Sequence, residues 1–103
     1  MTREDVTFVL TPSVPFGDAA DLLSLARLAA EGVHGESAVR LGLEQGGDPD
    51  ARTITVGAST DVGRSVVLIF TRFLARDFGE ESFVVRRHDP GGRFTTALPR
   101  PNA

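Results

Sequence analysis

The chain of 103 residues contains no cysteine, lysine, tyrosine or tryptophan. The lack of cysteine excludes disulfide bonds, thiolate nucleophiles and cysteine-based zinc sites, so apolar packing has to stabilise the fold. No apolar run is long enough to span a bilayer, and the first residues lack the apolar stretch of a secretion signal. We therefore expect a cytoplasmic protein.

The charge composition argues against nucleic acid as a partner. The formal net charge is -3, and all 11 basic residues are arginine, which is typical of a GC-rich bacterial genome. A mildly acidic chain without a basic cluster is a poor electrostatic match for a phosphate backbone. The length suits one domain with one modest core.

Periodicity predicts four strands and two helices. The β-branched and aromatic segment 6–10 predicts a buried central strand, and 83–87 predicts a final strand. Alternating apolar residues over 37–44 and 53–58 predict a hairpin around a turn-rich connector, 45–50.

The first predicted helix has Asp18 as its N-cap and ends between Gly32 and Gly35. Its predicted core arc consists of Leu22, Leu23, Leu25, Ala26, Ala29 and Val33. The second predicted helix runs from Thr60 to Phe78 and stops at Gly79. Its predicted core arc consists of Val62, Val66, Ile69, Phe70, Phe73, Leu74 and Phe78.

The element order predicts an α+β fold with a single βαββαβ domain. We expect a ferredoxin-like sandwich, with two helices on one face of a four-stranded antiparallel sheet. The order also resembles an open-faced sandwich of the histidine-phosphocarrier type, which adds a third helix. That family needs a histidine at the start of its first helix, where this chain has Phe16, Gly17 and Asp18, so we do not expect phosphotransfer.

We place the domain at residues 1–88 and a Pro/Gly-rich tail at 89–103. Part of the tail, 92–98, has the composition of a short edge strand. The remainder is either a frayed end or a linker to a downstream domain.

No motif predicts an enzyme, a cofactor or a metal site. The junction from Gly57 to Ser65 has hydroxyls and backbone N–H groups suited to phosphate, yet it lacks the P-loop ending and fits an N-cap better. His34 and His88 have no carboxylate at a recognised metal spacing. No serine lies in a nucleophile-elbow sequence.

The outer side of the second helix is the first part of a predicted partner-binding surface. Arg64, Leu68 and Arg72 recur there at intervals of four residues, opposite the phenylalanine-rich core side. An exposed leucine between two arginines resembles the apolar centre and charged rim of a small interface.

The first helix provides an acidic counterpart. Leu28 faces outward there with Asp21 and Glu31. The opposite charges either pair within the monomer or meet between molecules, and a head-to-tail contact would generate rings or filaments.

We expect a non-catalytic interaction or adaptor module that binds a partner protein or a second copy of itself. The alternative is a small-molecule regulatory domain with its ligand between Gly57 and Ser65. RNA binding is a third possibility. The open sheet face would offer Arg40, Thr53, Thr55 and Arg86 to RNA, but no stacking aromatics.

Overall fold

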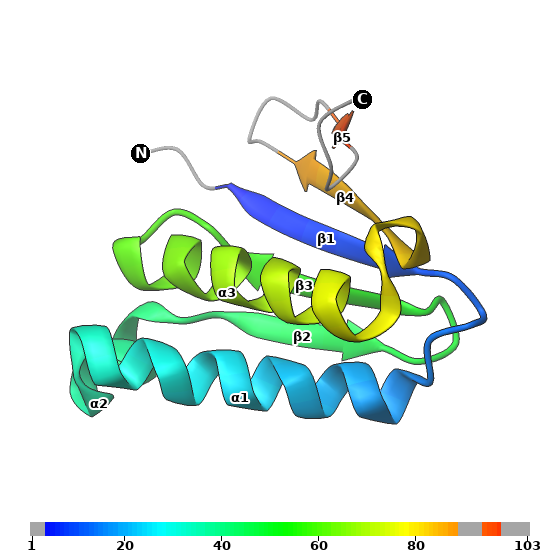
Figure 1. Cartoon of the computed structure of the whole chain (residues 1–103). Coiled ribbons are helices and arrows are strands. Elements are labelled where there is room, and N and C mark those ends of the chain that lie inside the picture. Colours follow the sequence, from blue (N-terminus) through cyan, green and yellow to red (C-terminus); the bar gives the residue numbers. More distant parts are fainter. Residues whose placement is uncertain (1–3, 89–93, 98–103) are drawn as a thin grey trace.

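The computed structural model describes residues 4–88 and 94–97, which form an α+β fold of one sheet and a layer of helices (Figure 1). The strands are β1 (Asp5–Leu10), β2 (Gln45–Asp48), β3 (Thr53–Gly57), β4 (Phe83–His88) and β5 (Phe94–Ala97). The helices are α1 (Phe16–His34), α2 (Glu36–Gly42) and α3 (Asp61–Phe78), with a 3-10 turn, η1 (Glu80–Ser82), before β4.

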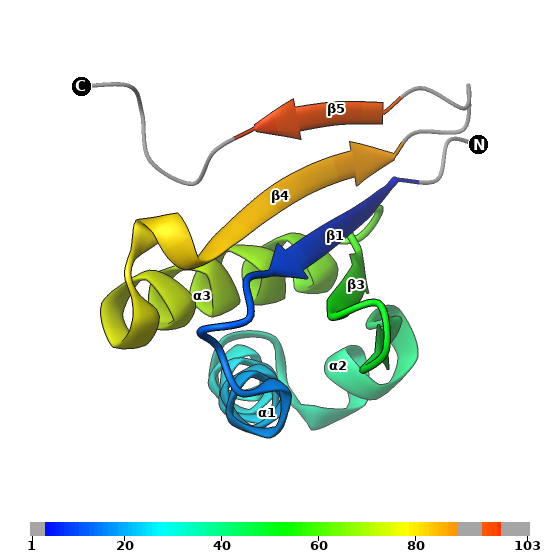
Figure 2. The ribbon, with the colours of Figure 1, turned by 90° about the vertical axis from the view of Figure 1, so that its right-hand side faces the viewer.

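The sheet is antiparallel and its strand order is β2-β3-β1-β4-β5. The central place of β1 agrees with the prediction from segment 6–10. Phe8 on β1 lies opposite Ile54 of β3 and Val85 of β4. In Figure 2, α1 and α3 pack against one face of the sheet, and none of the described helices lies on the other face.

The long helix α3 forms as its sequence predicts. Thr60 is the N-cap, and its side-chain oxygen accepts a hydrogen bond from the backbone N–H of Gly63. Gly79 ends the helix with a φ of 92°, a left-handed conformation that glycine adopts without steric cost. The buried side of α3 consists of Val62, Gly63, Val66, Phe70 and Leu74.

The core joins these two layers through apolar side chains of β1, β3, β4 and the helices. Phe8, Phe70 and Phe83 are among the largest fully buried side chains. The rings of Phe8 and Phe70 meet edge to face with centroids 4.8 Å apart. Such aromatic pairs add about 0.5–1.5 kcal/mol beyond the burial of their area.

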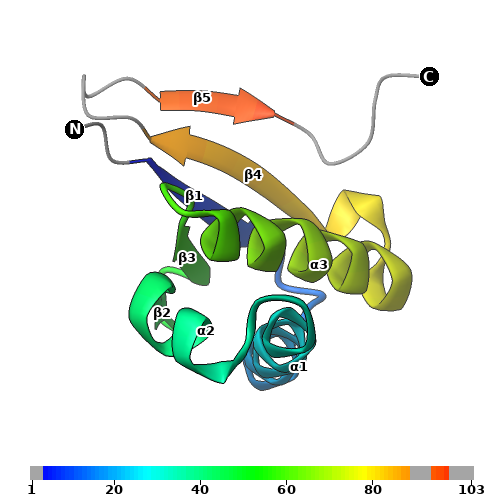
Figure 3. The same cartoon turned by 90° about the vertical axis from the view of Figure 1, so that its left-hand side faces the viewer.

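The predicted strand over 37–44 is wrong, because this segment forms the helix α2. Val39 is buried and Leu43 packs against the core, and their spacing of four residues matches one side of a helix. Leu41 lies between them in sequence and is 87% exposed. The described residues therefore form three α-helices rather than two, and Figure 3 shows α2 next to the C-terminal end of α1.

The predicted connector 45–50 is also corrected, because it begins with β2. Gln45, Gly46, Gly47 and Asp48 pair with β3 in register. The turn follows directly, and a side-chain oxygen of Asp48 accepts hydrogen bonds from the backbone N–H groups of Asp50 and Ala51. The hairpin thus consists of β2 and β3.

Helix α1 differs from its prediction at its start and in its buried side. It begins at Phe16, and the residue at its N-cap, Pro15, provides no side-chain hydrogen bond. The buried stripe consists of Ala19, Leu23, Ala26 and Ala30. Leu25, Ala29 and Val33, which we expected in the core, are exposed. The buried side of α1 is therefore narrower than its apolar composition suggests.

The alternative with a terminal third helix is not observed in the described part. The additional helix is α2, which precedes β2, and the next described element after β4 is the strand β5. The remainder of the tail, 89–93 and 98–103, lies outside the described residues, so its role as a linker stays a prediction.

Two glycine substitutions should have opposite effects on stability. A Cβ at Gly63 would collide with the carbonyl oxygen of Gly57, because α3 starts directly against the end of β3. Gly63→Ala should lower the free energy of unfolding by about 1–3 kcal/mol. Gly32, in α1, has open space around its Cβ position. Gly32→Ala should raise the same free energy by about 0.5–1 kcal/mol, and urea unfolding measures both.

Candidate docking surface

The large apolar side chains that are exposed lie on the helices. Among the described residues they are Leu25, Leu28 and Val33 on α1, Leu41 on α2 and Leu68 on α3. One exposed leucine is ordinary on a protein surface. Several on a single layer, with none from strands β1 to β4, distinguish the helix layer from that part of the sheet.

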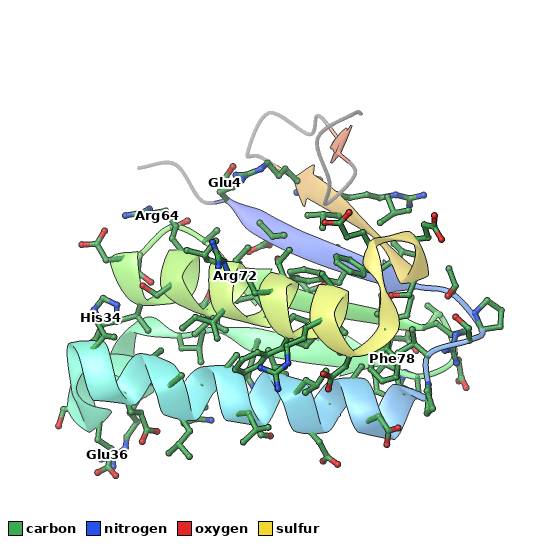
Figure 4. The ribbon with its side chains drawn as sticks, viewed as in Figure 1. Glu4, His34, Glu36, Arg64, Arg72 and Phe78 are labelled. Atoms are coloured by element: carbon green, nitrogen blue, oxygen red, sulfur yellow. The ribbon has the colours of Figure 1, made fainter. Side chains whose placement is uncertain are left out.

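On α3 the three predicted residues differ in what they contact. Leu68 is 59% exposed. Arg64 forms an ion pair with Asp61 and donates to the carbonyl oxygen of Ala58 at 3.2 Å, so its guanidinium is held at the start of the helix. Arg72 is exposed and makes no ion pair or side-chain hydrogen bond with any described residue (Figure 4).

On α1 the acidic counterpart is also unpaired. Leu28 is 62% exposed. Asp21 is exposed and Glu31 is half-buried. Within residues 4–88 and 94–97, no ion pair joins α1 to α3. Arg72, Asp21 and Glu31 therefore have no ion-pair partner in the described part of the chain, whereas Arg64 is paired with Asp61.

Two pairs of residues show the relative direction and the axial alignment of α1 and α3. At one end His34 Nε2 is 2.8 Å from Ser65 Oγ. Nearer the other end, Leu25 and Phe73 line the same hollow of about 230 Å³. The helices are therefore antiparallel. A residue of α1 lies level with a residue of α3 when their two residue numbers add up to about 98 or 99.

This alignment brings four of the six predicted residues together. Glu31 lies level with Leu68, and Leu28 lies level with the turn between Leu68 and Arg72. Packed helix axes are about 8–10 Å apart, so these four residues occupy one stretch of the helix layer. We call Leu28, Glu31, Leu68 and Arg72 the central patch.

The other two predicted residues lie away from the central patch. Arg64 is level with the C-terminal end of α1, and Asp21 is level with the C-terminal end of α3. Leu25 instead extends the patch, since it is 52% exposed and lies one turn before Leu28. In the sequence Leu25 belongs to a broad apolar arc that predicts burial, and only the packing of α1 shows which part of that arc is buried.

The junction before α3 uses its hydroxyls to connect elements. Ser59 Oγ accepts from the backbone N–H of Glu4 at 2.7 Å. Thr60 Oγ1 donates to the carbonyl oxygen of Gly42 at 2.7 Å while it caps α3. A phosphate bound here would have to displace these hydrogen bonds, which argues for the capping role of the junction.

His34 and Ser65 form a contact that the sequence did not reveal, since 31 positions separate them. Nucleophilic catalysis by a serine also requires an oriented imidazole and a site for the oxyanion. No carboxylate of the described residues bonds to His34. We interpret the pair as a polar link between the ends of α1 and α3 (Figure 4).

The described residues contain no group of three or more histidines, aspartates or glutamates that could hold a metal ion. In the same part of the chain, no helix is long and apolar enough to cross a membrane. Comparisons with protein-family models, with curated proteins and with solved structures found no match to the chain.

The His34–Ser65 link should be measurable as a coupling energy. Ser65→Ala and His34→Ala each remove one partner, so their combined effect should be smaller than the sum of the single effects by about 0.5–1.5 kcal/mol. Urea unfolding of the four proteins in a double-mutant cycle provides this value. Strict additivity would show that the two side chains do not stabilise each other.

Proposed function

We propose that this chain is a non-catalytic protein-interaction module and that its helix layer binds a second copy of the chain. The observation that carries the proposal is the central patch. It combines two exposed leucines with an acidic side chain on one helix and a basic side chain on the other, and neither charge has an ion-pair partner among the described residues.

A second copy fits the patch because the patch is complementary to itself. A two-fold axis between two helix layers sets α1 of one copy against α3 of the other. Glu31 of one copy then lies opposite Arg72 of the other copy. Leu28 of one copy likewise lies opposite Leu68 of the other copy. Apolar contact at the centre with charges at the rim is the usual anatomy of an interface.

We also propose the ferredoxin-like class for the fold and a cytoplasmic location for the protein. The support for the class is the strand order, in which β3 separates β1 from β2 and β1 separates β3 from β4. Each βαβ unit is therefore split by a strand of the other unit. Helix α2 and strand β5 are then additions to the common pattern.

Charge exchange between the two helices tests the docking proposal. Glu31→Arg and Arg72→Glu should each lower the self-association constant by about tenfold or more, because each places like charges opposite one another. An equimolar mixture of the two variants should associate again, since every charged contact in the mixed pair is between opposite signs. Sedimentation equilibrium at low ionic strength measures both effects.

Leu41→Ala is the matched control for Leu68→Ala, because both residues are exposed leucines but Leu41 lies on α2. Only Leu68→Ala should weaken association. A wild-type chain that stays monomeric at millimolar concentration would contradict the proposal. So would a mixture of charge variants that behaves like its separate components.

A further inference from the structure

The edge strand β2 has the features of a second docking site, independent of the helix layer. Among the described strands it pairs only with β3, and all four of its residues are exposed. Its sequence, Gln45-Gly46-Gly47-Asp48, contains neither the proline nor the lysine that often protects a free edge. The edge is thus open to another strand.

The hydrogen bonds of the hairpin show which backbone groups of β2 point outward. The N–H of Gly57 donates to the carbonyl oxygen of Glu44 at 2.7 Å. Along an antiparallel pair, residues that hydrogen-bond to the partner strand alternate with residues that do not. Gly46 and Asp48 therefore also hydrogen-bond to β3. Gln45 and Gly47 direct their backbone N–H and C=O groups away from the sheet. An added strand would pair with Gln45 and Gly47.

A hollow of about 310 Å³ lies beside this edge, on the helix side of the sheet. It is lined by Phe16, Ala20, Leu23 and Ser24 of α1 and by Gln45, Gly46, Gly47, Pro49 and Ile54 of the hairpin. Gly47 keeps it open, because a Cβ there would lie 3.1 Å from the ring of Phe16. Side chains of an added strand opposite Gln45 and Gly47 would enter this hollow, since paired residues share a face of the sheet.

The opposite side of the same edge is acidic. Glu44 and Asp48 lie on the open face by their register with Gly57 and Thr53. Glu44 and Asp5 line a second hollow there. The alternate side chains of an added strand would face these carboxylates, and basic residues complement them.

We infer that β2 binds an extended segment of another protein in which apolar and basic residues alternate. The segment adds a sixth strand to the sheet. Its apolar side chains fill the hollow beside Phe16 and its basic side chains face Glu44 and Asp48. This site goes beyond the proposed helix-layer contact and does not depend on it.

The test uses a blocked nine-residue peptide of alternating valine and arginine, added to the full chain. Hydrogen exchange by NMR should slow at the amides of Gln45 and Gly47, with little change at Gly46 and Asp48, which already bond to β3. A peptide of the same composition with its valines and arginines in two blocks should bind more weakly. Equal binding of the two peptides, or protection away from β2, would overturn the inference.

Two variants locate the site, and a third is the control. Gly47→Pro removes an outward N–H but no bond to β3, and Ala20→Phe fills the hollow from α1. Each should weaken peptide binding by about tenfold or more. Gly32→Ala should leave it unchanged, because Gly32 lies near the C-terminal end of α1, outside the residues that line the hollow. Unchanged affinity in both Gly47→Pro and Ala20→Phe would reject the site.

Self-association through the helix layer can be tested separately from peptide binding at β2. Arg72→Glu should weaken self-association without changing the affinity for the peptide. If Arg72→Glu strengthened peptide binding while Gly47→Pro left it unchanged, the peptide would be binding through its charge alone and the inference would fail.

Discussion

The edge-to-face contact between Phe8 and Phe70 is the constraint on which the rest of the structure depends. It joins the central strand to α3, and both side chains are fully buried. Leu68 precedes Phe70 by two residues, which is about 200° around a helix. Burying Phe70 therefore turns Leu68 outward. The same contact places α3 against β1, so that α1 packs beside α3 and turns Leu28 to the same outer side.

The elements tied to this contact could be predicted from the sequence, because several local features agree there. In α3, Thr60, the phenylalanine-rich side and Gly79 specify the start, the buried side and the end. The segment that forms β1 is β-branched and aromatic, as a central strand requires. The outward positions of Leu68 and Leu28 followed from the helical period alone.

The other parts of the structure, which the sequence did not predict, depend on contacts between residues that are distant in sequence. Three apolar residues at alternate positions fit a strand, yet the segment forms α2, which buries Val39 and ends so that Leu43, directly after it, also packs against the core. Strand β2 has no apolar period at all, and pairing with β3 alone makes it a strand. The exposure of Leu25 depends on where α1 lies beside α3. For the same reason, the central patch could be proposed from the sequence only as two separate stripes.

The helix layer and the sheet edge offer different chemistry. The central patch is apolar with one charge of each sign, which suits a copy of itself, whereas the β2 edge is acidic and lined by backbone groups, which suits an extended basic segment. The most direct test of the central claim is the concentration dependence of the leucine methyl signals of the wild-type chain by NMR. The account predicts shifts at Leu28 and Leu68 and none at Leu41. Shifts at Leu41 alone, or none at any leucine up to millimolar concentration, would contradict it.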